Sequence, residues 1–149
     1  MTFLYLDASA WVKRYYREPG SQRVHELLAS EDQPACSVLG VVEVIATLAR
    51  KYKALEITRD DFEAKLPEIE IDWRSFIQIE LTLTALDQAK DAAARFALRG
   101  ADAVHFAALL SLNRRLSNSG HHVVLIASDR ELKEAAQASE ITVIDPEAL

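Results

Sequence analysis

The sequence predicts an α/β fold, with a central parallel sheet of four to five strands and helices on both of its faces. Short apolar runs alternate along the chain with longer segments of helical periodicity, which is the pattern of a parallel sheet. Two of these runs, at 3–6 and 123–127, are apolar throughout, as expected of strands buried on both sides. The length of 149 residues fits one domain over residues 1–149.

The first half of the chain divides into segments at clear turn and capping signals. Glu18, Pro19 and Gly20 break one helix, Gly40 opens another, and Pro67 ends a third. Thr58, followed three residues later by an Asp, resembles a capping box. The expected elements are a strand at 3–6, helices at 9–16 and 21–29, a strand at 35–39, and helices at 41–53 and 58–66.

The second half follows the same alternation. The segment 76–83 alternates apolar and polar residues, which favours a strand exposed on one side. Gly100 is a helix stop signal, and Ser128 with Glu131 forms a capping box for a helix to about Ala138. The expected elements are a strand at 76–83, helices at 84–99 and 102–112, a strand at 123–127, a helix at 128–138 and a strand at 141–144.

Composition narrows the class of protein. Cys36 is the one cysteine, so no internal disulfide can form and a reducing, cytoplasmic setting is expected. The N-terminus shows no signal-peptide pattern, and no apolar run approaches the roughly 20 residues of a membrane helix. The net charge of −6 argues against nucleic-acid binding by bulk electrostatics. It leaves open a nucleic-acid enzyme whose acidic pocket holds cations.

Four carboxylates lie in or directly after apolar stretches, where burying an ionised acid costs free energy. Asp7 and Asp129 each follow an apolar strand, Glu43 lies among valines within a helix, and Asp102 lies in another apolar stretch. In an open α/β fold such residues meet at the carboxyl edge of the sheet, where ligands bind. Two carboxylates about 4 Å apart repel by roughly 4 kcal/mol at an effective dielectric near 20. A divalent metal, Mg²⁺ or Mn²⁺, would supply the missing positive charge.

Each acid taken singly also has a structural interpretation. Asp7 can cap the helix that begins near Ser9, and Asp102 and Asp129 can be helix N-terminal acids. Glu43 has no capping role in the middle of a helix. The pattern of four therefore favours a shared site over four separate structural roles.

The ordered set of motifs resembles a PIN domain of the VapC type, the ribonuclease toxin of toxin–antitoxin pairs. The similar segments are Leu6-Asp7-Ala8-Ser9-Ala10, Glu18-Pro19-Gly20-Ser21, Glu43 in its helix, the segment 98–105 around Asp102, and Ser128-Asp129-Arg130-Glu131-Leu132. The resemblance implies that Asp7, Glu43, Asp102 and Asp129 are the metal-binding and catalytic quartet, with Ser9 as a supporting residue. The region 60–76 is the least similar, and nothing is carried over there.

The resemblance also implies a mechanism and partners. One or two Mg²⁺ or Mn²⁺ ions would activate a water molecule that attacks an RNA phosphodiester. A VapB-like antitoxin would neutralise the enzyme with a basic side chain in the acidic site, and the toxin would form a homodimer.

Several other residues have two open interpretations. His105 lies one helical turn after Asp102, and either touches the site or packs in the core. The basic residues Lys13, Arg14 and Arg17 either guide RNA phosphate or form a solvated helix face. Trp11, Tyr15 and Tyr16 fit the core or a partner surface, and His121 and His122 lack a third metal ligand at useful spacing.

Alternative functions remain open at this point. A non-catalytic PIN-like module that binds RNA or a protein is the main one, although all four acids are present. A phospho-acceptor receiver domain would need an acceptor Asp after 76–83 and a Lys after 141–144, and the sequence has neither. A haloacid-dehalogenase-like phosphatase would need a second Asp where Ser9 stands.

Overall fold

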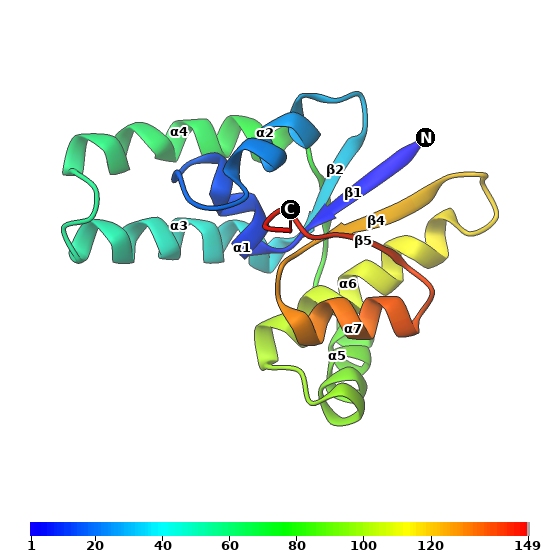
Figure 1. Cartoon of the computed structure of the whole chain (residues 1–149). Helices are drawn as coiled ribbons and strands as arrows, with labels where there is room; N and C mark the ends of the chain where they lie inside the picture. The colour runs from blue at the N-terminus through cyan, green and yellow to red at the C-terminus, as the bar shows by residue number, and fades with distance from the viewer. Residues whose placement is uncertain (149) are drawn as a thin grey trace.

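A five-stranded parallel sheet forms the centre of the protein. The computed structural model describes residues 1–148, and its sheet has the strand order β3-β2-β1-β4-β5. Figure 1 shows β2, β1, β4 and β5 of this sheet. The pairings β1–β2, β1–β4, β2–β3 and β4–β5 are all parallel. The strands are β1 (Thr2–Leu6), β2 (Gln33–Ser37), β3 (Ile77–Ile79), β4 (His122–Ile126) and β5 (Thr142–Ile144).

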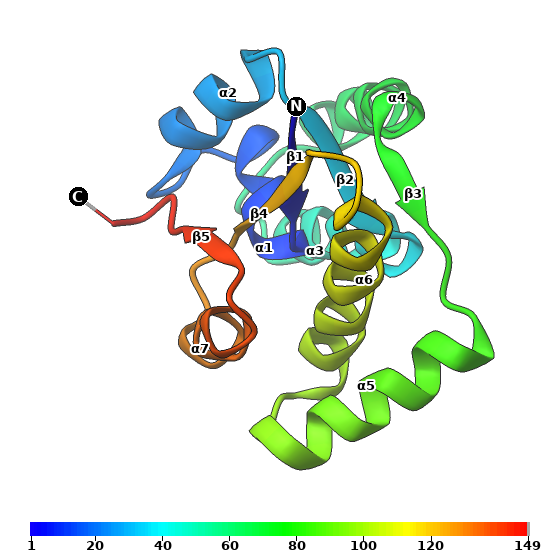
Figure 2. The same ribbon diagram turned by 90° about the vertical axis from the view of Figure 1, so that its right-hand side faces the viewer.

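Helices cover both faces of this sheet, so the predicted α/β architecture is confirmed. Figure 2 shows α1 to α4 gathered on one side of the sheet and α5 to α7 on the other. The side chains of the central strand β1 alternate between the two sides. Leu4 and Leu6 pack in the core formed with α1 to α4, and Tyr5 packs in the core formed with α5 to α7. The helices are α1 (Ala8–Trp11), α2 (Ser21–Ala29), α3 (Val38–Lys53), α4 (Arg59–Ser75), α5 (Leu83–Phe96), α6 (Gly100–Leu116) and α7 (Arg130–Ala138), with a 3-10 turn η1 (Val12–Arg14) after α1.

The second strand and the helix after it begin earlier than the sequence pattern indicates. Ser37 ends β2 and caps α3, because its Oγ accepts a hydrogen bond from the backbone N–H of Leu39 at 3.2 Å. Gly40 is therefore the third residue of α3 rather than its opening signal. A serine side chain at this junction was the stronger boundary signal.

Pro67 does not end α4, contrary to the prediction. The helix continues through Pro67 to Ser75, and its second half buries Ile69 completely. Trp73 stacks on Trp11 with ring centroids 5.5 Å apart. The apolar contacts of these two side chains outweigh the backbone hydrogen bond that proline removes.

Three further boundaries differ from the prediction. Helix α5 ends at Ala97, which adopts a left-handed backbone with φ of 54°, and Gly100 instead begins α6. Helix α7 is capped by Asp129, not by Ser128, since the Asp129 carboxylate accepts from the N–H of Leu132. Strand β3 is confined to three residues at the edge of the sheet. In the described part of the chain, no helix has the length and hydropathy needed to cross a bilayer.

Candidate active site

The reversal of strand order creates the crevice of the sheet. From β1 the chain moves to β2 and β3 on one side, and then to β4 and β5 on the other. Such a reversal leaves a crevice at the carboxyl ends of the two central strands, which is where open α/β folds bind ligands. Asp7 directly follows β1, and Asp129 caps the helix that follows β4. The topology thus brings two of the predicted carboxylates to this edge.

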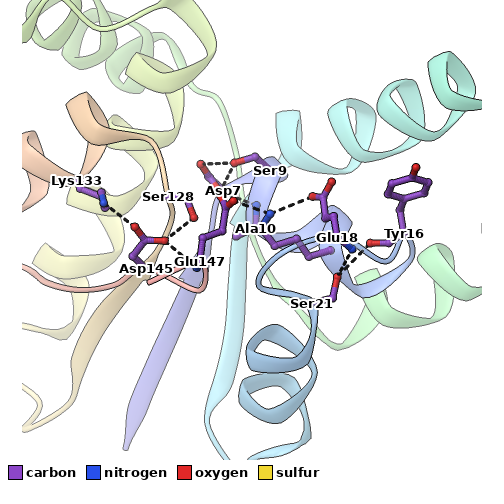
Figure 3. Close-up of polar contacts among 11 residues, drawn as sticks. Asp7, Ser9, Ala10, Tyr16, Glu18, Ser21, Ser128, Lys133, Asp145 and Glu147 are labelled. Carbon is purple, nitrogen blue, oxygen red and sulfur yellow. Dashed lines mark hydrogen bonds and ion pairs between the residues drawn. The ribbon is translucent and has the colours of Figure 1, made fainter. Parts of the chain in front are cut away.

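Asp7 is a buried carboxylate with a small set of donors. The residue is 3% exposed, and its Oδ1 accepts from the backbone N–H of Ala10 at 2.9 Å. The Ser9 hydroxyl donates to the same carboxylate, 3.1 Å from either oxygen (Figure 3). The pKa of Asp7 is raised to about 6 by burial and, to a smaller extent, by the charge of Asp102, although His105 and these hydrogen bonds lower it. Asp7 therefore caps α1 and is also an electrostatically costly acid.

Glu43 reaches the site from the middle of α3. Its side chain is 29% exposed, and Oε1 lies 2.6 Å from Nε2 of His105 on α6. The His105 ring is buried, and its Nδ1 lies 2.7 Å from the hydroxyl of Tyr5. The interpretation of His105 as a residue that touches the site is thus the one that the geometry favours.

Asp102 and Asp129 both form an ion pair with the guanidinium group of Arg99. Asp102 lies in the first turn of α6, 3.5 Å from Nε of Arg99, and Nη2 of Arg99 donates to Oδ1 of Asp129 at 3.1 Å. Burial raises the pKa of Asp102, and the neighbouring charges of Asp129 and Glu43 raise it further. Arg99 and His105 have the opposite effect on this pKa.

Asp102 therefore lies within electrostatic reach of each of the other three carboxylates. Asp102 raises the pKa of Asp7, and Glu43 and Asp129 raise that of Asp102. Within residues 1–148, however, no three carboxylate, imidazole or thiol groups are arranged closely enough to hold an ion. In this conformation each acid has a protein partner instead: Ser9 for Asp7, His105 for Glu43, and Arg99 for the other two.

Of the three basic residues with two open interpretations, Lys13 and Arg14 are held in ion pairs. Lys13 is buried and forms ion pairs with Glu18 at 3.0 Å and Glu147 at 3.6 Å. Arg14 pairs with Asp72 at 2.6 Å. Both side chains are therefore paired with carboxylates of the chain, so neither is an unpaired phosphate ligand or a simple solvated residue. Arg17 is exposed.

The aromatic residues and surface histidines follow their structural interpretations. Trp11 and Tyr15 are buried, and the Trp11 indole donates to the Tyr15 hydroxyl at 3.0 Å. His121 lies beside the amino terminus, and His122 contacts Thr2.

Sequence reasoning missed two residues at this edge, Arg99 and Asp145. The spacing of Arg99 three residues before Asp102 on a helix was the available signal for the first. Asp145 follows β5, which repeats the strand-then-Asp pattern of Asp7. It accepts from Ser128 at 2.6 Å and from Lys133 at 2.7 Å, as Figure 3 shows. Despite partial burial, the bonds from Lys133 and Ser128 lower the pKa of Asp145 to about 2, so this acid is already compensated.

Comparison with known proteins assigns the family. The PIN domain family model matches residues 4–138. The chain belongs to the PIN domain family. Two curated relatives from Mycobacterium tuberculosis, Ribonuclease VapC45 (strain CDC 1551 / Oshkosh) and Ribonuclease VapC49 (strain ATCC 25618 / H37Rv), are each 36% identical to this PIN domain over 143 residues, covering 93% of this chain and 92% of the relative. The resemblance to VapC-type PIN domains is thereby confirmed.

Solved structures share the fold of this PIN domain at low sequence identity. A toxin–antitoxin complex from Klebsiella pneumoniae matches with a TM-score of 0.64 at 16% identity, covering 98% of this chain and 99% of that one. VapBC2 from Rickettsia felis, bound to a promoter DNA fragment, matches with a TM-score of 0.63 at 12% identity over 97% and 98% of the two chains. PAE2754 from Pyrobaculum aerophilum gives 0.62 at 20% identity over 95% and 83%. Divalent-metal dependence is general among PIN-domain VapC ribonucleases.

Proposed function

We propose that this PIN domain is a metal-dependent endoribonuclease and the toxin of a toxin–antitoxin pair. The observation that carries the proposal is the group of carboxylates at the crevice of the sheet, which includes the buried Asp7. The 36% identity to VapC ribonucleases over nearly the whole chain supports the same activity.

The donor set suits Mg²⁺ or Mn²⁺. Asp7, Glu43, Asp102 and Asp129 offer only carboxylate oxygens, which these hard cations prefer. Burial raises the pKa of both Asp7 and Asp102, so a bound cation would offset the cost of keeping these two carboxylates ionised. These four residues would hold the ion, with Asp7 and Asp102 as the leading direct ligands. When bound, the metal would supply an activated water and neutralise the phosphodiester and the leaving oxygen.

The remaining residues prepare this site. Ser9 and the N–H of Ala10 fix the orientation of the Asp7 carboxylate. Arg99 supplies positive charge to Asp102 and Asp129, and its side chain is 77% exposed, so it can leave them at little cost when a stronger cation arrives. No serine, cysteine or histidine nucleophile is required by this chemistry.

The toxin assignment includes two partners. We infer a VapB-like antitoxin, since several proteins of the same fold were solved as toxin–antitoxin complexes. A basic side chain of that antitoxin would bind the carboxylates, as Arg99 already does within the chain. We also propose that the toxin forms a homodimer.

We expect the purified protein to cut single-stranded RNA in the presence of Mg²⁺ or Mn²⁺, and to stop when EDTA is added. Asp102→Asn should lower the rate at least about a hundredfold, because a lost ligand removes several kcal/mol of transition-state stabilisation. The matched control is Asp87→Asn, because Asp87 is an acid on α5 whose side chain is 76% exposed. Cleavage of a fluorescently labelled RNA, followed by gel electrophoresis, measures the activity of the wild-type protein, of Asp102→Asn and of Asp87→Asn.

Two outcomes would contradict the proposal. Equal activity in EDTA would exclude the metal mechanism. Absence of both cleavage and divalent-metal binding, measured by calorimetry, would favour the alternative of a non-catalytic PIN-like module that binds RNA or protein.

A further inference from the structure

His105 is a buried polar residue for which the proposed chemistry has no use. Its ring is 2% exposed and lies between two close partners, Glu43 at 2.6 Å and Tyr5 at 2.7 Å. Such short contacts on both nitrogens define the orientation of the ring. We infer that His105 is a positioning residue, which holds the Glu43 carboxylate in the active site; this inference rests on the proposed function.

The direction of each hydrogen bond in this chain can be assigned. The backbone N–H of Ser37 donates to the Tyr5 oxygen at 3.1 Å, and burial raises the pKa of Tyr5, so the hydroxyl keeps its proton. That one proton is then free to be donated to Nδ1 of His105. With Nδ1 as acceptor, the ring proton lies on Nε2, which donates it to Oε1 of Glu43. Tyr5 thus selects the tautomer of His105 in which Nε2 donates to Glu43.

Glu43 depends on this bond more than the other acids depend on theirs. The carboxylates of Asp7 and Asp129 are fixed by backbone N–H groups of Ala10 and Leu132 at helix starts. Glu43 lies inside α3, where every backbone N–H nearby belongs to the helix ladder, and its side chain is longer and more flexible. Among residues 1–148, His105 is its hydrogen-bond partner, and that bond occupies Oε1 while Oε2 stays available as a ligand.

The chain of bonds also joins the elements that carry the acids. Tyr5 lies on β1, two residues before Asp7, and His105 lies on α6, one turn after Asp102. Glu43 comes from α3, on the other face of the sheet from α6. The Tyr5–His105–Glu43 chain therefore sets the position of the Glu43 carboxylate relative to the two elements that carry Asp7 and Asp102.

The test compares variants of His105 that keep or remove the donor. His105→Leu should weaken Mn²⁺ binding and lower kcat for RNA cleavage by about 10–100-fold, as is typical of residues that orient metal ligands, while KM for RNA stays unchanged. His105→Gln should recover much of both losses, because its amide nitrogen can donate in place of Nε2. Calorimetric titration with Mn²⁺ alone gives the affinity independently of activity. The matched control is His122→Gln, an exposed histidine that contacts Thr2.

A second variant keeps the inference testable if His105→Leu fails to fold. Tyr5→Phe retains the ring but removes the proton that selects the His105 tautomer, so we expect a smaller loss in Mn²⁺ affinity and kcat. Wild-type Mn²⁺ affinity and kcat in a folded His105→Leu or, failing that, in Tyr5→Phe would overturn the positioning role. A wild-type protein that neither binds Mn²⁺ nor cuts RNA would overturn the proposed function itself, and this role with it.

Discussion

Asp7→Asn should abolish RNA cleavage and, at the same time, stabilise the metal-free protein at pH 7. Activity should fall at least about a hundredfold, because Asn is a weak ligand for a hard cation. Stability should rise because the folded protein raises the pKa of Asp7 from 3.8 to about 6, so ionising this buried group disfavours folding. Asn can still accept the Ala10 N–H and cap α1. Urea unfolding in EDTA, alongside the RNA assay, measures both effects.

The pH dependence of this gain has a defined sign. Protonated Asp7 favours the fold fully below the unfolded pKa near 3.8, and this contribution is lost as pH rises through about 6. The stability difference between Asp7→Asn and wild type should therefore grow between pH 4 and pH 6.5 and then level off, by at most about 3 kcal/mol.

Asp145→Asn is the matched control for this prediction. Its carboxylate has a lowered pKa of about 2, so it stabilises the fold above pH 4 and loses this effect as pH falls toward 2. The Asn variant should be less stable at pH 7, on the order of 1 kcal/mol, because Lys133 and Ser128 lose a charged partner at a partly exposed site. RNA cleavage should persist. A stability loss in Asp7→Asn, or cleavage at the wild-type rate, would contradict our account of Asp7.

Gly40→Ala should destabilise the protein by about 1–3 kcal/mol through overpacking. A Cβ added at Gly40 would overlap Sγ of the buried Cys36, far inside the van der Waals distance. It would also contact Cε1 of His105 at 3.5 Å. Because both side chains are held by the sheet and α6, neither can move away freely.

Cys36→Ala should rescue this loss. Removing Sγ leaves the Cys36 Cβ 3.6 Å from the new methyl group, which is an ordinary contact. The double variant would also gain the higher helix propensity of Ala, worth up to about 1 kcal/mol. A double-mutant cycle by urea unfolding measures the coupling between the two positions. If the effects of the two substitutions simply add, the close packing of α3 on β2 is not what requires glycine at position 40.

The fold was predictable because its strands are short, apolar and well separated by helices. The element boundaries were less so, and α4 shows why. Pro67 is a local stop signal, whereas the contacts of Ile69 and Trp73 that carry the helix onward are tertiary. Ala97 follows the last residue of α5 in a left-handed conformation that is unusual for alanine and has no local sequence signal. The sequence pattern therefore places the end of α5 at Gly100, which in the structure begins α6.

The candidate site was predictable to a different extent. Asp7 and Asp129 could be placed together because parallel strands end at a common edge. The contact between Arg99 and Asp129 joins residues 30 apart in sequence, and no local pattern indicates it. Likewise, the bond from His105 to Glu43 spans 62 residues, so the sequence alone left the role of His105 open. The catalytic roles of the four acids stay predictions until the variants are measured.

The pairing of β1 with β4 has a consequence for the synthesis of the protein on the ribosome. Thr2 pairs with His122, so the central strand gains its second neighbour only after most of the chain has been translated. A nascent or prematurely terminated chain that ends within α5 or α6 lacks both β4 and Asp129. On the proposed function, such a chain would lack at least one of the four acids and would not cut RNA, so activity would appear only when translation is nearly complete.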